Sequence, residues 1–183
     1  MIEQLDLPGL WCWTPRRHRD ARGWFSETFN QRALRLVLGD VRFVQDNRAY
    51  SRDSGVLRGL HFQIPPMAQD KLVHVEHGSI RDVVVDLRRS SPVFGRCIKI
   101  DLSSDPGTQL FIPKGCAHGY VTREPDTVVA YKVSNYYSPE HAKGIHWRDP
   151  VLAIDWGIEL DDVVISENDS RLPLFTEIPE YFE

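Results

Sequence analysis

Short apolar runs separated by turns that contain glycine or proline recur along this chain and limit the folds open to it. Within the runs, apolar and polar residues alternate or β-branched residues follow one another, a pattern typical of strands. Strands spaced at about ten residues predict an all-β sandwich or barrel. The expected strands are Val41–Asp46, Val56–Gln63, Leu72–His77, Ile80–Leu87, Arg96–Leu102, Thr108–Ile112 and Val128–Tyr136.

One short helix is expected in this otherwise β-type sequence. It covers Glu27–Leu38, where apolar residues recur at a helical spacing, and Gly39 follows as a terminator. From Trp147 onward the apolar residues are scattered among prolines, which favours an irregular C-terminal tail packed on the barrel over a second domain. Residues 1–183 are therefore expected to form a single domain.

The net charge indicates which classes of partner the chain can bind, and the cysteines indicate its cellular compartment. A formal net charge of −4 argues against a general nucleic-acid binder, although a local cationic site for a small anion remains open. Cys12, Cys97 and Cys116 lack metal-ligand spacing and fit free thiols in a reducing compartment. The sequence shows neither a signal-peptide pattern nor a membrane-spanning stretch, so a cytoplasmic location away from membranes is expected.

The segment GVLRGLHFQ, residues 55–63, sets Arg58 and His61 three positions apart among apolar neighbours. On a regular strand, side chains three apart point to opposite faces. Gly59 between them permits a bulge or a close backbone approach that would bring both to one cavity. An imidazole beside a cation suits proton abstraction from an anionic substrate. The alternative is a surface arginine and a hydrogen-bonded core histidine, and this segment alone does not separate the two.

Basic residues inside apolar segments are a second signal. An unpaired buried cation is costly, so such residues pair with carboxylates or with a bound anion. The three basic residues Arg22, Arg58 and Lys71, with the polar residues Gln45, Asp46, Asn47 and His118, could together bind a diphosphate. His118 is expected in a loop between two strands. Ordinary ion pairing with carboxylates such as Glu27, Asp46 or Asp82 is the alternative for each basic residue alone.

Tyr131 lies on an expected strand inside VVAYKVSNYY. Such a tyrosine is usually a core aromatic with a satisfied hydroxyl, but its phenol can also donate a proton to a carbanion. No metal site is expected, because His74 and His77 are three apart on one strand and His61 has no histidine two positions away. Serine nucleophile elbows, phosphate-cradling glycine loops and dinucleotide fingerprints do not occur in the sequence.

Eight segments occur in this order: DARGWFSE (20–27), FVQDN (43–47), GVLRGLHFQ (55–63), AQDKLVHV (68–75), DVVVDLRRSSPVFG (82–95), QLFIPKGCAHGY (109–120), YKVSNYYSPE (131–140) and WRDP (147–150). Together they resemble the dTDP-4-dehydrorhamnose 3,5-epimerase family, from about residue 8 to about residue 170. The resemblance implies a cupin-type jelly-roll barrel, no metal or other cofactor, and homodimers formed by strand exchange.

The resemblance also implies roles for individual residues. His61 is the expected base, Tyr131 the expected acid, and Asp169 in SENDS the partner of the histidine. Lys71 is the candidate to stabilise an enolate oxygen, with Arg58 as the alternative. Around the nucleotide sugar the resemblance places Arg22, Glu27, Gln45, Asp46, Asn47, Arg58, Lys71 and His118, with Asp82 as a second carboxylate for the cavity.

The expected reaction converts a dTDP-linked 4-keto-6-deoxy sugar, dTDP-4-dehydro-6-deoxy-D-glucose, to dTDP-4-dehydro-L-rhamnose. Two positions depart from the family pattern: Asn168 stands where a lysine is usual, and Ala142 where many members have a glutamate, with Glu140 as a shifted candidate. These departures leave open an epimerase of one carbon or an enzyme on another nucleotide sugar. A keto-isomerase on a related nucleotide sugar and a non-catalytic sugar-nucleotide-binding cupin are separate alternatives.

Overall fold

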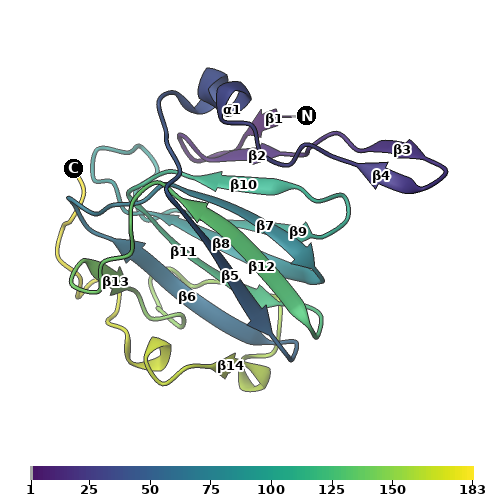
Figure 1. The fold of residues 1–183 in the computed structure, drawn as a ribbon. Helices are drawn as coiled ribbons and strands as arrows, with labels where there is room; N and C mark the ends of the chain where they lie inside the picture. The colour runs from purple at the N-terminus through teal and green to yellow at the C-terminus, as the bar shows by residue number, and fades with distance from the viewer. Residues whose placement is uncertain (1) are drawn as a thin grey trace.

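The strands form two large sheets and a small hairpin in the computed structural model, which describes residues 2–183 (Figure 1). The first sheet has the order β1 (Ile2–Gln4), β2 (Trp11–Trp13), β10 (Gln109–Ile112), β7 (Lys71–His77), β12 (Thr127–Val133) and β5 (Gln45–Ser51). The second has the order β13 (Ala142–Gly144), β6 (Val56–Gln63), β11 (Cys116–Thr122), β8 (Ser79–Asp86) and β9 (Cys97–Ser103). Strand β14 (Val164–Ile165) runs parallel to β6, and the other ladders are antiparallel.

The main core lies between the two sheets. Apolar side chains from β7, β10 and β12 meet those from β8, β9 and β11, with Val73, Val84, Leu110 and Val129 all buried there. Alternation along each strand supplies this filled inner face, as expected for stacked antiparallel sheets. The cupin-type jelly roll predicted for the chain is confirmed.

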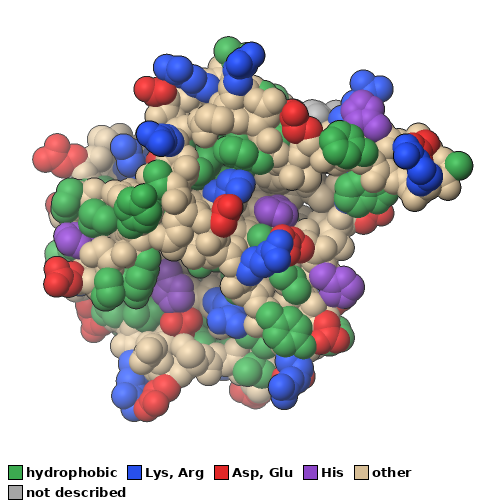
Figure 2. All heavy atoms as spheres, in the orientation of Figure 1, with side chains coloured by type: hydrophobic (Ala, Val, Ile, Leu, Met, Phe, Trp, Pro, Cys, Tyr) green, Lys and Arg blue, Asp and Glu red, His purple; other side chains and the backbone are tan. Residues whose placement is uncertain are grey.

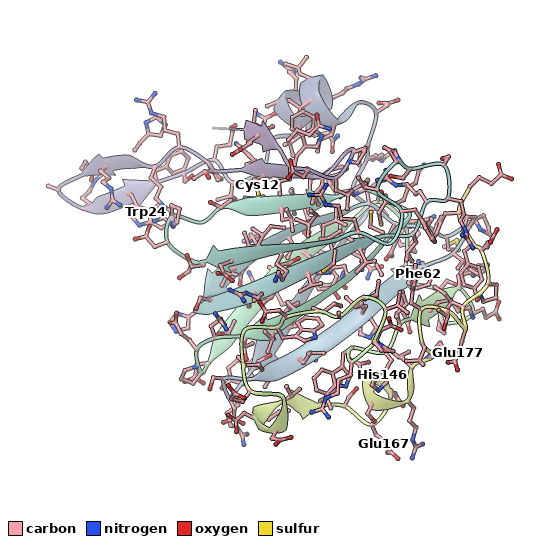
Figure 3. The ribbon with its side chains drawn as sticks, turned by 180° about the vertical axis from the view of Figure 1, so that it is seen from behind. Cys12, Trp24, Phe62, His146, Glu167 and Glu177 are labelled. Carbon is pink, nitrogen blue, oxygen red and sulfur yellow. The ribbon has the colours of Figure 1, made fainter. Side chains whose placement is uncertain are left out.

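The outer face of each sheet is covered by a different part of the chain. Helix α1 (Gln31–Leu38) packs Leu34 against Leu72 and Phe111 on the first sheet. The C-terminal segment covers the second sheet, where Trp147 and Trp156 pack with residues of β6, β8 and β11. Figure 3 shows this segment from behind, crossing the barrel. The predicted irregular tail is thus a packed layer, which includes the 3-10 turns η1 (Leu160–Asp162) and η2 (Asp169–Arg171).

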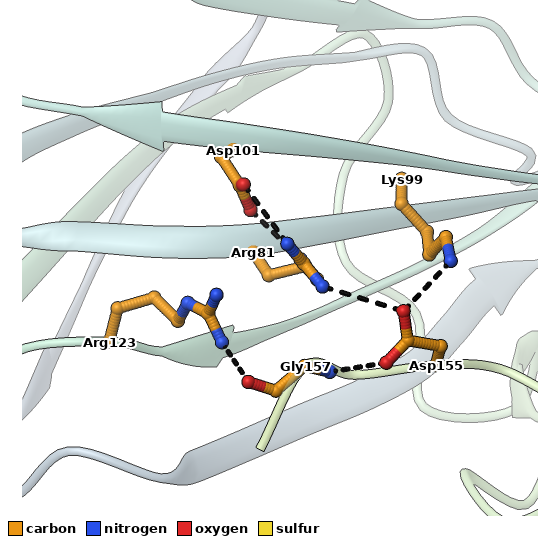
Figure 4. A network of polar contacts seen from close by, with 6 residues as sticks. All are labelled: Arg81, Lys99, Asp101, Arg123, Asp155 and Gly157. Atoms are coloured by element: carbon orange, nitrogen blue, oxygen red, sulfur yellow. Dashed lines mark hydrogen bonds and ion pairs between the residues drawn. The ribbon is translucent and has the colours of Figure 1, made fainter.

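Polar contacts fasten this tail to the sheet. The Arg81 guanidinium donates to both carboxylate oxygens of Asp101 within the sheet and lies 3.7 Å from Asp155 of the tail. Asp155 also accepts a bond from Lys99 at 3.1 Å (Figure 4). Arg123 donates to the carbonyl oxygen of Gly157. Because the Asp155 side chain is 65% exposed, solvent screens its ion pairs and they stabilise the tail only modestly.

A buried carboxylate makes the stronger anchor. Asp149, 2% exposed, accepts hydrogen bonds from the backbone N–H groups of Val151, Leu152 and Phe175. Replacing Asp149 with alanine leaves these donors without their carboxylate, so we expect a loss of about 3 kcal/mol in the free energy of unfolding. The matched change Asp155→Ala is expected to cost less than about 1 kcal/mol. Urea unfolding of both variants measures the difference, and equal losses would contradict the assigned anchor.

Three expectations about elements need correction. The strand expected at Val41–Asp46 is observed at Gln45–Ser51, because residues 41–44 leave the ladder and pack beside α1. The helix begins at Gln31 rather than Glu27, since the Asn30 side chain caps it by accepting from the N–H of Ala33. The segment around His118 is strand β11, not a loop; its Gly and Cys content hid a fully buried central strand.

The hairpin of β3 (His18–Asp20) and β4 (Gly23–Phe25) projects away from the barrel (Figures 1 and 3). It carries Trp24 and Phe25, which are 52% and 71% exposed. Exposed large apolar groups on a projecting arm are typical of a contact surface. Within residues 2–183, no helix has the length and apolar character needed to cross a bilayer.

Candidate active site

A bulge in β6 determines the directions of the Arg58 and His61 side chains. His118 of β11 pairs with His61 and Tyr120 pairs with Arg58, so one residue on β11 faces two on β6. Both Arg58 and His61 therefore emerge on the same side and line one cavity. This register contains the bulge that Gly59 was expected to permit, and it decides between the two interpretations that the segment had left open.

Glycine is required on both strands at this point. Gly59 has φ +130°, and a Cβ there would lie 2.5 Å from the Cα of Gly119. A Cβ on Gly119 would in turn lie 2.9 Å from the carbonyl oxygen of Arg58. The two backbones approach too closely for any side chain, so the bulge depends on this glycine pair.

The His61 ring is fixed by a carboxylate from the distant tail. Its Nε2 lies 2.8 Å from Oδ1 of Asp169, and Oδ2 of Asp169 accepts the backbone N–H of Gly59 at 3.1 Å. Burial raises the pKa of Asp169, but the hydrogen bonds from His61 and Gly59 prevail and hold it below its usual value. With the ionised carboxylate accepting from Nε2–H, the neutral ring keeps its lone pair on Nδ1.

The cavity around His61 has a volume of about 390 Å³ and opens on one side of the barrel. Figure 2 shows histidine and basic side chains in a depression on the face over β6. The cavity is lined by Ala49, Arg58, His61, Phe62, Gln63, Gln69, Lys71, His118, Tyr120, Tyr131, Tyr137, Ala142, Lys143, Ser166 and Asp169. Within the described chain, no three His, Cys, Asp or Glu side chains are placed to share a metal ion.

Charged groups lie deep in this cavity. Lys71, 9% exposed, donates from Nζ to the carbonyl oxygen of His61 at 3.2 Å. Burial lowers the pKa of Lys71 to about 8, and the nearby negative Asp82 opposes the shift. Asp82 is fully buried, and its Oδ2 lies 2.8 Å from Nε2 of His118. His118 and Lys71 thus line the cavity, while Asp82, expected as a second cavity carboxylate, lies behind the wall as the partner of His118.

Tyr131 enters the cavity from the other sheet. It lies on β12, paired with Val73 on one side and Asn47 on the other. Burial raises the pKa of Tyr131, and the positive Arg58 partly offsets the shift. Its hydroxyl is therefore protonated at neutral pH, the state that a general acid requires.

The remaining candidates lie outside the set that lines this cavity. Arg22 sits in the β3–β4 turn, ion-paired with Asp20 at 2.6 Å, and Glu27 is exposed on the following segment. Asp46 accepts a bond from Lys132 at 2.7 Å, on the outer face of the first sheet. Arg22 therefore belongs to the projecting arm, and neither Arg22 nor Glu27 lies among the residues that line the cavity of the same chain.

Of the other two β5 candidates, Gln45 contacts the segment that connects β12 to β13, and Asn47 contacts Gln45. Gln45 donates from Nε2 to Oδ1 of Asn47 at 2.8 Å and accepts from the N–H of Tyr137. Several lining residues were missed by the sequence reading, among them Gln63, Gln69, Tyr120, Tyr137, Lys143 and Ser166. A two-residue spacing from His61 points to Gln63, whereas Tyr137 and Lys143 lie on a connection whose path the sequence pattern does not define.

Comparison with known proteins identifies the family. The family model described as dTDP-4-dehydrorhamnose 3,5-epimerase matches residues 4–177. This chain belongs to that family. The dTDP-4-dehydrorhamnose 3,5-epimerase of Escherichia coli (strain K12) is 47% identical over 159 residues, which cover 86% of this chain and 85% of the relative. The family predicted from the eight ordered segments is confirmed.

Solved structures of epimerases share the whole fold. The dTDP-4-dehydrorhamnose 3,5-epimerase from Elizabethkingia anophelis NUHP1 has a TM-score of 0.93 at 37% identity, with 97% of each chain covered. The dTDP-6-deoxy-D-glucose-3,5-epimerase from Legionella pneumophila, in complex with dTDP-4-keto-L-rhamnose, has a TM-score of 0.92 at 40% identity. That match covers 98% of this chain and 94% of the other. The epimerase-family fold therefore extends over nearly all of the chain described here.

Proposed function

We propose that this chain is an isomerase that epimerises dTDP-4-keto-6-deoxyglucose at C3 and C5, giving dTDP-4-keto-L-rhamnose. The observation that carries the proposal is the His61–Asp169 pair in one cavity with Lys71 and Tyr131. A base fixed by a carboxylate, a buried cation and a protonated phenol are the groups that an enolate mechanism needs.

In the proposed first step, Nδ1 of His61 takes the proton from a carbon next to the keto group. The electron pair of that C–H bond forms the C=C bond of an enolate, and the C4 oxygen becomes negative. Asp169 stabilises the imidazolium that results, because it already accepts from Nε2–H at 2.8 Å. The Lys71 ammonium is the proposed partner of the enolate oxygen, with Arg58 as the alternative.

The second step returns a proton to the opposite face of the carbon. The phenol of Tyr131 is the proposed donor: it gives its proton as the enolate collapses to the ketone, and inversion results. Before the second cycle the imidazolium gives its proton to solvent and the Tyr131 phenolate takes one from solvent. Repeating the two steps on the other carbon then inverts both centres. No electrons leave the substrate in either step, so no redox cofactor is required.

Lys71 makes the proposed reaction sensitive to pH. Its pKa is lowered to about 8 by burial, so the ammonium is present below that pH and lost above it. We expect turnover to fall as pH rises through about 8, because the neutral amine no longer stabilises the enolate. In Asp82→Asn the charge that raises this pKa is gone, so the fall should begin at lower pH. Steady-state rates between pH 6 and 10 measure both profiles, and a fall that began at higher pH in Asp82→Asn would contradict the role of Asp82.

Deuterium uptake tests the substrate. Incubation of dTDP-4-keto-6-deoxyglucose with the protein in heavy water, followed by NMR, is expected to show deuterium at C3 and C5. Uptake confined to C3 would support an epimerase of one carbon, which the departures at Ala142 and Asn168 make worth testing. Binding without uptake, seen as thermal stabilisation, would instead support a sugar-nucleotide-binding protein.

We further propose that the active form is a homodimer in which the β3–β4 arm of one copy completes the cavity of the other. The support is the exposure of Trp24 and Phe25 on an arm that leaves its own barrel. Arg22 on that arm would then supply a cation for the diphosphate in trans.

Complementation measures this arrangement. Arg22→Glu and His61→Ala are each expected to be inactive, while their co-expressed mixture should recover about a quarter of the wild-type activity, since half of the dimers are mixed and one of their two cavities is intact. Single-variant dimers expressed separately provide the baseline. Failure of the mixture to recover activity would contradict an arm that acts in trans.

A cytoplasmic location is also proposed for this chain. Its support is that Cys12, Cys97 and Cys116 are all free thiols.

A further inference from the structure

The connection between β12 and β13 forms part of the cavity wall without belonging to a sheet (Figure 1). It carries Tyr136 and Tyr137, both more than half exposed, and the Tyr137 side chain lines the cavity. The N–H of Ser134 bonds to the carbonyl oxygen of Asp70. Further along the chain, the N–H of His141 donates to the carbonyl oxygen of Ser138. Between these two points the backbone is held by side chains.

Gln63 is central to this support. It is the last residue of β6, two positions after His61, and is only 5% exposed. Its Nε2 donates to the carbonyl oxygen of Tyr136 at 3.1 Å, and its Oε1 accepts the N–H of Ser138 at 2.7 Å. A second bond from Nε2 reaches the carbonyl oxygen of Met67 at 2.7 Å. The Gln63 amide thus bonds the backbone on both sides of Tyr137 and links this segment to the loop after β6.

Gln45 holds the intervening residue from the opposite sheet. Its Oε1 accepts the N–H of Tyr137 at 3.1 Å. Gln45 begins β5 in the first sheet, whereas Gln63 ends β6 in the second. Two amides from the two sheets therefore bond three successive residues, and the segment spans the gap between the sheets at the cavity. A connection with so few backbone partners would otherwise open at little cost.

We infer that Gln63 is a positioning residue for the proposed epimerase: it holds the segment 136–138 so that the Tyr137 ring forms a fixed wall for the sugar nucleotide. The inference rests on the proposed function for its substrate, but the hydrogen bonds from Gln63 to the segment 136–138 are present in the free protein. An amide suits this task because it offers a donor and an acceptor in one plane, which match the carbonyl of Tyr136 and the N–H of Ser138. Burial makes the loss of either bond costly.

A double-mutant cycle tests the inference. Gln63→Met keeps the length of the side chain and removes all three bonds, and we expect a rise of at least fivefold in KM for dTDP-4-keto-6-deoxyglucose, with a smaller change in kcat. Gln63→Glu keeps the oxygen that accepts from Ser138 and is expected to fall between Gln63→Met and wild type. In a Tyr137→Ala background, Gln63→Met should change KM less than twofold, because the ring that it positions is gone.

A matched control separates positioning from stability. Thr122, also buried, bonds the backbone of Val56 and Asp53 at the other end of β6. Thr122→Val is expected to lower Tm and leave KM unchanged. Equal effects of Gln63→Met with and without the Tyr137 ring would overturn the inference. Inactivity of the wild-type protein on this substrate would instead overturn the proposed function.

Amide hydrogen exchange tests the grip without substrate and in the wild-type chain. The N–H groups of Tyr137 and Ser138 donate to the side-chain oxygens of Gln45 and Gln63 and not to a backbone carbonyl, yet they should exchange slowly because these two amides hold them. Faster exchange confined to this segment is expected in Gln63→Met. Rapid exchange of both amides in the wild-type protein would overturn the inference, whether or not the variants fold.

Discussion

Replacing His61 with alanine is expected to reduce deuterium uptake at both C3 and C5 by about 10³-fold, since a positioned general base contributes about 10²–10⁴-fold. In the proposed mechanism one imidazole serves both carbons, so the two positions should lose uptake together. The ring lines the cavity through the β6 bulge, and its removal leaves Lys71 and Tyr131 in place. Binding of the nucleotide sugar should therefore survive.

NMR of the substrate in heavy water measures the uptake, and isothermal titration with dTDP measures binding. His146→Ala is a matched control, because His146 lies on the tail behind the barrel, stacked on Trp147 (Figure 3). That variant should keep wild-type uptake. Loss at only one carbon in His61→Ala would require a second base and would contradict the proposed single-base mechanism.

The partner of His61 shows what sequence reasoning can and cannot supply. Asp169 is separated from His61 by 108 positions and belongs to the irregular tail, so no periodicity connects the two. Its pairing was expected only from the family resemblance. In the fold, the tail covers the outer face of β6 and brings η2 to the backbone of Gly59. Burial of tryptophans and aliphatics along the tail makes this placement stable, which is a property of packing and not of local pattern.

The sequence pattern predicted those features that depend on residues near one another along the chain. Gly59 indicated where a bulge was permitted, and alternation predicted most strands of both sheets. It failed for β11, whose Cys, Ala and Gly content is unusual for a strand but fits one buried on both faces. The arm was missed as well, since the exposed Trp24 and Phe25 look like core residues in sequence. Apolar residues that serve a contact between copies are indistinguishable from core residues until the fold is known.

Tyr131→Phe is expected to slow inversion more than exchange. The base is untouched, so proton removal and return from the same face continue, and deuterium should still enter C3 and C5. Return from the opposite face loses its donor, and we expect product formation to fall by about 10²-fold, near the lower end of general acid catalysis. Burial raises the pKa of Tyr131, so its hydroxyl carries a proton at neutral pH, and phenylalanine has no proton to offer in its place.

The ratio of deuterium uptake to product, followed by NMR in one sample, measures this partition. Tyr50→Phe is the control, because the Tyr50 hydroxyl bonds Asp126 on the exposed surface and should leave the ratio unchanged. If uptake and inversion fell equally in Tyr131→Phe, the phenol would be assisting enolate formation and not the return of the proton. A ratio that rises only in Tyr131→Phe assigns the two faces of the sugar to two residues from opposite sheets, which is the arrangement that the bulge in β6 and the register of β12 create.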